Sequence, residues 1–384
     1  MQPSPLQPTT LTLSGERLRV TYELTGDSDR TTAIAEQLVI EQTIEFPPEL
    51  VPDDDILGQI LGRIESSTTI DNGIRIQVSY AEEIVGGQLP QLLNVLFGNM
   101  SMVPGVKVVD VELPDSLKRA FPGPRHGLAG LRHRFGVESG PLLATALKPM
   151  GTPIDRLASL AGQMAVGGIS LIKDDHSFAT QPFADFRQRV VAIADAVNSA
   201  DSGSIYLPAL NVPMDELPAA ATFALEAGAG GLLVLPGIFG FDTMRWLSQH
   251  TPDHTVIMSH PALLGSFVAS RESGFSHSVM FGQIPRLAGA DVSIFPNYGG
   301  RFAFPQDDCA AIAQACTAPD STMRPAWPCP AGGMSVERVP NMVRFYGVDT
   351  CLLIGGDLYR GSIAEQAERI AEALRHIETE ETTA

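Results

Sequence analysis

Short apolar runs alternate with helical stretches over the second part of the chain. From about residue 140 these runs recur roughly every 25 to 35 residues, and each ends in Gly, Pro or polar residues. Strands that are apolar throughout and alternate with helices indicate a parallel sheet covered on both faces. Eight such units predict a closed (β/α)8 (TIM) barrel rather than an open sheet. The predicted strands are Leu142–Pro149, Gly168–Asp175, Ile205–Val212, Gly231–Pro236, Thr255–His260, Asp291–Pro296, Arg324–Pro330 and Thr350–Gly355.

A different pattern precedes the barrel. Between about residues 17 and 115 the order reads strand, helix, strand, strand, helix, strand, with a strong turn signal at Asp71-Asn72-Gly73. That order predicts a ferredoxin-like α+β domain, so the fold class is α/β with domains at 11–120 and 121–384. The six elements are Arg17–Leu24, Thr31–Thr43, Leu57–Thr68, Gly73–Tyr80, Leu89–Gly98 and Val106–Val111.

Charge and composition narrow the classes of partner. The chain has 26 Lys and Arg against 44 Asp and Glu, a net charge of −18, which argues against nucleic acid and anionic membranes as partners. A small anionic substrate remains possible, because a few backbone N–H groups can hold one phosphate. No long apolar run or signal-peptide pattern is present, and the four cysteines form no C-x-x-C pair. We therefore expect a cytoplasmic protein with reduced, buried cysteines.

Polar residues gather at the carboxyl ends of the predicted strands. In a (β/α)8 barrel these ends converge on one mouth, where active sites are built. The residues expected there are Lys148, Lys173, Asp174, Asp175, His176, Asn211, His260, Asn297, Arg301, Gly332-Gly333 and Gly355-Gly356.

The densest group is Lys173-Asp174-Asp175-His176. Side chains alternate along a strand, so Lys173 and Asp175 share one face and Asp174 points away, while His176 can turn inward at the strand end. These groups could hold a divalent metal if Lys173 became a carbamate by reaction with CO2. The alternative is a lysine–aspartate ion pair that closes the strand.

The other mouth residues also allow two interpretations. Lys148 could carry a proton or form a Schiff base if burial lowers its pKa, or it could simply extend from the barrel end into water. His260 could be a structural histidine and Arg301 a solvated loop residue. The glycine pairs Gly332-Gly333 and Gly355-Gly356 follow strands 7 and 8, whose loops commonly bind phosphate in barrels.

One segment resembles a known family. Gly167 to Arg189, GGISLIKDDHSFATQPFADFRQR, is similar to the signature of ribulose-bisphosphate carboxylase (RuBisCO), and the Leu-Lys-Pro ending at Pro149 resembles the strand-1 lysine motif of that family. Gly123-Pro124 with Gly127 resembles the segment that leads into its barrel. The resemblance implies a homodimer with the active site at the subunit interface. It also implies that Glu41 and Asn99 bind substrate in the mouth of the partner subunit.

Several positions depart from the carboxylase pattern. Met150 replaces the second lysine of Lys-Pro-Lys, His176 replaces a metal-binding glutamate, and Pro261 replaces an arginine that clamps one phosphate of the substrate. Ile294, Ala331 and Arg301 stand where the carboxylases have histidine, serine and the mobile-loop lysine. The resemblance is therefore to a RuBisCO-like protein (form IV) that does not fix CO2.

The retained residues imply enolate chemistry on a substrate with one phosphate. Lys148, Lys173, His260 and Arg301 are the expected catalytic residues, with Mg²⁺ at Lys173, Asp175 and His176. Mn²⁺ or Zn²⁺ is the alternative because of the imidazole. Asn211 and the two glycine pairs are expected to bind substrate.

The first substrate hypothesis is a phosphorylated keto sugar acid such as 3-oxo-isoapionate 4-phosphate, undergoing decarboxylation or transcarboxylation with hydrolysis. The alternatives are an enolase or isomerase of methylthio-sugar phosphate salvage, a regulatory protein with a relic site, and a carboxylase with altered groups.

Overall fold

Two compact units make up the computed structural model, which describes residues 6–52, 54–300, 302 and 304–383. The first unit is Met1–Phe121 with Leu264–Gln283, and the second is Pro122–Leu263 with Ile284–Ala384. The sequence pattern assigns residues 264–283 to the barrel. The structure groups this segment with the first unit, because β10 (Gly274–Phe275) pairs in parallel with β4 (Val106–Glu112).

The first unit is a five-stranded sheet in the order β10-β4-β1-β3-β2. Strand β1 is antiparallel to both β3 and β4, and β2 is antiparallel to β3. The predicted strand–helix–strand–strand–helix–strand order is confirmed. The elements, besides β4 and β10, are β1 (Arg17–Thr25), α1 (Ser28–Glu41), β2 (Arg63–Ile70), β3 (Gly73–Ala81), α2 (Leu89–Phe97) and α3 (Asp115–Lys118).

The start of β2 differs from the prediction. The β-rich run was expected from Leu57, but Ile56–Ile60 forms one π-helical turn and the strand begins only at Arg63. The Arg17 guanidinium donates to the carbonyl oxygens of Gln59 (3.1 Å) and Leu61 (3.5 Å). A long-range side chain thus takes carbonyls that a strand ladder would otherwise use.

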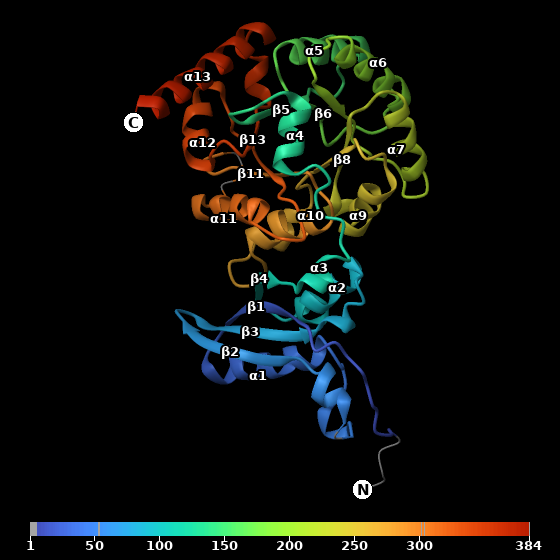
Figure 1. Ribbon diagram of the computed structural model, residues 1–384, viewed down its shortest axis with the longest axis vertical. Coiled ribbons are helices and arrows are strands. Elements are labelled where there is room, and N and C mark those ends of the chain that lie inside the picture. The colour runs from blue at the N-terminus through green and yellow to red at the C-terminus, as the bar shows by residue number, and fades with distance from the viewer. Residues whose placement is uncertain (1–5, 53, 301, 303, 384) are drawn as a thin grey trace. The chain divides into compact units, whose positions relative to one another are not determined.

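The second unit is a barrel of eight parallel strands in the order β7-β6-β5-β13-β12-β11-β9-β8. A bridge between Ala209 and Leu233 joins the two ends of this order. All eight predicted strands are present, and Figure 1 shows the helices arranged around them. The strands are β5 (Leu142–Leu147), β6 (Leu171–Asp174), β7 (Ile205–Leu207), β8 (Gly231–Val234), β9 (Val256–Ser259), β11 (Val292–Pro296), β12 (Trp327–Ala331) and β13 (Cys351–Leu353). The helices are α4 (Gly127–Phe135), α5 (Ile154–Val166), α6 (Phe186–Asn198), α7 (Leu217–Glu226), α8 (Pro236–Phe239), α9 (Phe241–His250), α10 (Ile284–Leu287), α11 (Gln306–Thr317), α12 (Val339–Tyr346) and α13 (Ile363–Thr383).

Every barrel strand contributes to one apolar core. Leu131 of α4 is fully buried in this core, and Leu128 and Phe135 pack against it. The indole N–H of Trp327 donates to the carbonyl oxygen of Gly127 at 3.3 Å, which attaches α4 to β12. The barrel interior is therefore filled by side chains, which leaves its ends for chemistry.

The carboxylate of Asp291 joins three segments of the barrel. It is fully buried, and its two oxygens accept the backbone N–H groups of His126 (2.8 Å) and Ile257 (3.0 Å). Asp291→Asn would place an amide donor against a backbone donor, so we expect a loss of about 1–3 kcal/mol in unfolding free energy. Urea unfolding measures this loss, with the exposed Asp253→Asn as the control. Equal stability of the two variants would contradict this role.

The four cysteines are buried thiols, as expected from the sequence. All four belong to the second unit, at positions 309, 316, 329 and 351. Within the described ranges, none of the helices combines the length and the apolar character that a membrane span requires.

Candidate active site

The ends of β5 and β6 bring the central side chains together. The two strands pair in register, with Ala146 opposite Lys173 and Leu147 opposite Asp174. Lys148 and Asp175 are the next residues along each strand. The Lys148 Nζ lies 3.1 Å from Oδ2 of Asp175, and Nδ1 of His176 lies 3.2 Å from Oδ1. Three of the predicted site residues therefore meet at one carboxylate.

Asp175 is held in its ionised form. Burial acts against the charge, but the Oγ and backbone N–H of Ser177 donate to Oδ1 at 2.8 and 3.1 Å, and the Lys148 ammonium lies beside Oδ2. Together these contacts hold the pKa of Asp175 well below its usual range. The site thus keeps one fixed negative charge at physiological pH.

Lys173 is the buried amine of the site. Its side chain is almost fully buried, and Nζ donates to the carbonyl oxygen of Asp174 at 3.0 Å. Burial lowers the pKa of Lys173 to about 8, with the Lys148 charge acting in the same direction and Asp175 opposing it. About a tenth of the amine is therefore neutral at pH 7, far more than for an ordinary lysine. Only a neutral amine can react with CO2 or accept a proton.

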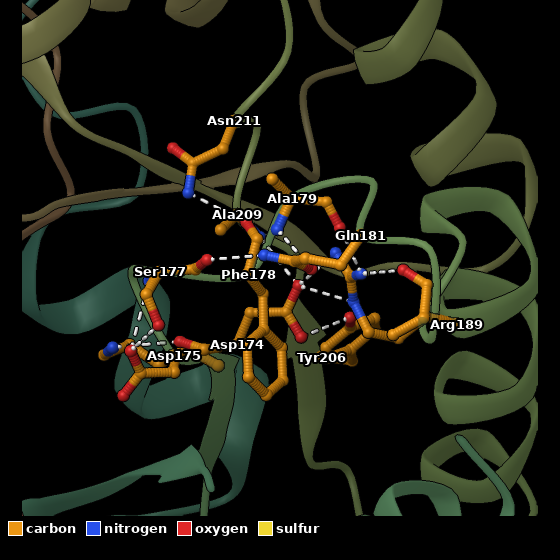
Figure 2. Close-up of polar contacts among 12 residues, drawn as sticks. Asp174, Asp175, Ser177, Phe178, Ala179, Gln181, Arg189, Tyr206, Ala209 and Asn211 are labelled. Atoms are coloured by element: carbon orange, nitrogen blue, oxygen red, sulfur yellow. Dashed lines mark hydrogen bonds and ion pairs between the residues drawn. The ribbon is translucent and has the colours of Figure 1, made fainter. Parts of the chain in front are cut away.

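Asp174 points away from the mouth, as the strand alternation predicts. Figure 2 shows Arg189 reaching from α6 toward this carboxylate, with Nη2 and Nε both 3.3 Å from Oδ2. Tyr206 donates to Oδ1 at 2.7 Å and the backbone N–H of Ala209 donates to Oδ2 at 3.1 Å. Both charged side chains are fully buried. This pair fixes the end of β6, and sequence reasoning missed it although both residues lie in the signature segment.

The two histidines of the site are stacked. The rings of His176 and His260 lie 4.5 Å apart with an angle of 13° between their planes. The backbone N–H of Ala262 donates to Nδ1 of His260 at 3.1 Å, so the neutral ring carries its proton on Nε2. Burial, reinforced by Lys173 and His176, holds the pKa of His260 well below its usual value. His260 is therefore a neutral hydrogen-bond donor.

Asn211 holds the loop that follows β6. Its Nδ2 donates to the carbonyl oxygens of His176 (2.6 Å) and Phe178 (2.8 Å), and Figure 2 shows Asn211 beside this loop. Tyr359 has a similar role at the end of β5. Its hydroxyl donates to the carbonyl oxygen of Ala146 and accepts the N–H of Lys148, both at 3.0 Å. Sequence reasoning missed Tyr359, which follows the second glycine pair by three residues.

The glycine pairs lie in the loops expected for phosphate. Gly332 and Gly333 have φ of 84° and 69°, which favours glycine, and they follow β12. A Cβ added at Gly355 or Gly356, after β13, would meet no atom within 4 Å. The backbones of Gly355 and Gly356 are thus open to a ligand. Arg301 lies outside the described residues.

Glu41 and Asn99 lie together in the first unit. The Nδ2 of Asn99 donates to Oε2 of Glu41 at 3.3 Å and to Oε1 of Glu45 at 3.1 Å. The two predicted substrate-binding residues are therefore neighbours within that unit.

The metal-ligand count depends on Lys173. In the described part of the chain, no three His, Cys, Asp or Glu side chains are grouped to hold a metal. Asp175 and His176 supply one carboxylate and one imidazole, and a carbamate on Lys173 would supply a second anionic oxygen donor. That donor set fits a divalent cation.

Comparisons with known proteins show the family to which this chain belongs. The model of the ribulose bisphosphate carboxylase large chain, catalytic domain, matches residues 127–297. The 5-methylthioribulose-1-phosphate isomerase of Rhodospirillum rubrum is 39% identical over 349 residues, which cover 89% of this chain and 91% of the relative. The chain belongs to the RuBisCO large-chain family.

Its similarity extends to RuBisCO-like proteins over the whole fold. The crystal structure of the RuBisCO-like protein from Rhodopseudomonas palustris superposes with a TM-score of 0.83 at 36% identity, covering 94% of this chain and 98% of that one. The 2,3-diketo-5-methylthiopentyl-1-phosphate enolase of Bacillus pumilus is 31% identical, covering 90% of this chain and 89% of the relative. This RuBisCO-like chain thus has relatives that are named as enzymes.

Proposed function

We propose that this RuBisCO-like chain catalyses metal-assisted enolisation of a singly phosphorylated ketose or keto acid and does not fix CO2. The observation that carries the proposal is the group at the ends of β5 and β6. There, a buried amine with a lowered pKa lies in the same site as an ionised carboxylate and a second lysine. The neutral amine of Lys173 can take up CO2 to become a metal-binding carbamate, and the second lysine, Lys148, can then exchange a proton with the carbon next to a carbonyl.

Lys173 as a carbamate, Asp175 and His176 would hold the metal. Mg²⁺ is our first choice, and Mn²⁺ or Zn²⁺ is the alternative because His176 contributes nitrogen. When bound, the metal would polarise the substrate carbonyl and stabilise negative charge that develops on its oxygen.

The remaining residues move the proton and orient the substrate. Lys148 is half-exposed and held by Asp175, so its Nζ can exchange a proton with the substrate carbon while the carboxylate keeps it in place. The Nε2–H of His260 can donate to the substrate oxygen without changing its own charge. Asn211 and Tyr359 act indirectly, because they fix the loops that carry His176 and Lys148.

One phosphate is the expected anchor. The open backbones of Gly355 and Gly356, with the positive-φ pair Gly332-Gly333 in the preceding loop, could offer N–H groups to an anion. Pro261 takes the place of the arginine that would clamp a second phosphate. We expect ribulose 5-phosphate to bind at least about tenfold more tightly than ribulose 1,5-bisphosphate, since the second phosphate would lack a cation partner. Isothermal titration calorimetry measures both affinities, and equal values would contradict the single-phosphate hypothesis.

Two substrates deserve the first tests. The name of the R. rubrum relative favours 5-methylthioribulose 1-phosphate, on which enolisation followed by reprotonation at the neighbouring carbon would give an isomer. His176 in place of glutamate favours the second, 3-oxo-isoapionate 4-phosphate. There, loss of CO2 from the β-keto acid, or transfer of the carboxyl group with hydrolysis, would proceed through the same enolate.

We also propose a homodimer in which Glu41 and Asn99 complete the partner's site. Light scattering gives the mass in solution. Suppose that Lys173→Met and Asn99→Ala each abolish activity. Mixing the two variants and allowing their subunits to exchange should then restore about one quarter of wild-type activity, because half of the dimers are hybrids with one intact site. A dimer without any recovery would place Asn99 in its own subunit's site.

The deciding experiment is proton NMR in D2O with a panel of phosphorylated ketoses and keto acids, with Mg²⁺, Mn²⁺ or Zn²⁺ present. Deuterium incorporation next to the ketone, with or without release of CO2, is the expected result. Absence of exchange and product with all three metals would favour a regulatory protein with a relic site. Bisphosphate-dependent fixation of labelled bicarbonate would instead support an altered carboxylase.

A further inference from the structure

Three consecutive loops of the barrel mouth are joined by two side chains that the proposed chemistry does not use. The loops follow β11, β12 and β13, and the latter two carry the glycine pairs expected to bind phosphate. The side chains are Arg338, which ends the 3-10 turn Val336–Arg338, and Asp357, which follows Gly355-Gly356 directly.

Arg338 bridges the first two loops. Its Nη1 donates to the carbonyl oxygen of Gly333 at 2.8 Å, and its Nη2 donates to the carbonyl oxygen of Tyr298 at 3.2 Å. The guanidinium carbon also lies 5.8 Å from the centre of the Tyr298 ring. Hydrogen bonds from a cation are stronger than neutral ones, and the planar guanidinium fixes the directions of both.

The same two loops touch through their backbones. A Cβ added at Gly300 would lie 2.4 Å from the carbonyl oxygen of Gly332, so no side chain fits between them. The backbone N–H of Asn297 also donates to the carbonyl oxygen of Ala331 at 2.8 Å. A displacement of either loop would therefore disturb its contacts with the other.

Asp357 joins the third loop to this pair. Its Oδ2 accepts the backbone N–H of Val336 at 2.9 Å, and its Oδ1 lies 3.1 Å from Nε of Arg360. Val336 begins the turn that ends at Arg338, so the contacts form one continuous chain from Tyr298 to Asp357.

We propose that Arg338 and Asp357 are positioning residues that couple the three loops into one phosphate-binding unit. The inference rests on the phosphate role of the glycine pairs in the proposed function. An anion bound to one pair then orders the other pair and residues 297–300 after β11, because the contacts of Arg338 and Asp357 link their positions. Phosphate affinity depends on Arg338 and Asp357 even though the chemistry does not.

The test uses the full chain with 15N-labelled glycine, and inorganic phosphate and ribose 5-phosphate as probes. In the wild type, either probe should shift the amide signals of Gly332, Gly333, Gly355 and Gly356 together. Arg338→Met should weaken binding about tenfold or more and confine the shifts to one pair. Arg344→Met, an exposed arginine of the adjacent helix, is the matched control and should leave both unchanged.

A ligand-free measurement separates this coupling from the phosphate role. Without any anion, Arg338→Met and Asp357→Ala should each speed hydrogen exchange of the Val336 amide about tenfold or more, since its partner or its turn is released. Unchanged exchange in Arg338→Met would overturn the coupling. Wild-type glycine signals that do not respond to either probe would overturn the phosphate site instead, and would do so independently of the exchange result.

Discussion

Lys173→Met is expected to abolish deuterium exchange into the substrate while the barrel stays folded. Methionine fills a similar volume, but it can neither form a carbamate nor take up a proton. We expect kcat/KM to fall by at least about 10³-fold, the upper part of the range for removal of a catalytic acid or base. Stability should be unchanged or higher, because the variant no longer buries an amine that is partly charged.

The pH dependence of wild-type activity provides a second test of the role of Lys173. Since the pKa of Lys173 is lowered to about 8, its neutral fraction should fall about tenfold for each pH unit below that value. Activation by bicarbonate and metal should follow this fraction and level off above pH 8.

Lys107→Met, in the first unit, is the control for the Lys173→Met variant. Exchange by Lys173→Met within about tenfold of the wild-type rate would exclude Lys173 from the chemistry.

Arg189→Met is expected to produce the largest loss of stability. The substitution leaves the carboxylate of Asp174 fully buried without its cation, which costs about 3–5 kcal/mol when one member of a buried pair is removed. The loss should be smaller in acid. Burial already raises the pKa of Asp174, so the protonated form becomes available there and needs no cation. Urea unfolding at two pH values measures both effects.

Two further variants separate the effect of the lost charge from the effect of the lost packing. Arg187 is exposed on the same helix and stacks on Phe223, so the cost of Arg187→Met should stay below about 1 kcal/mol. The double variant Asp174→Asn with Arg189→Met should recover most of the lost stability, because no unpaired charge remains. A double variant as unstable as Arg189→Met alone would show that packing of the guanidinium, and not its charge, holds the end of β6.

The barrel and its mouth could be predicted because their signals are local. Continuous apolar runs mark the eight strands, and strand alternation places Lys173 and Asp175 on the side opposite Asp174. The ferredoxin-like order of strands and helices in the first unit follows from equally local patterns. The proximity of Lys148 to Asp175 follows from the pairing of the consecutive parallel strands β5 and β6.

The features that escaped prediction depend either on partners distant in the chain or on the local backbone geometry. Residues 264–283 join the first unit through a two-residue strand, too short to leave a periodic signal. The π-helical turn at Ile56–Ile60 accompanies contacts from Arg17, about 40 positions earlier. The tautomer of His260 is set by a backbone N–H two residues on, which no residue type reveals.

The confinement of all four thiols to the barrel gives this protein a built-in probe of partial unfolding. The first unit contains no cysteine, and the barrel cysteines are buried in the folded state. A thiol-specific reagent therefore reacts when the barrel opens and stays silent when only the first unit opens. Comparing labelling rates with the total unfolding rate would separate the two units kinetically without any engineered label.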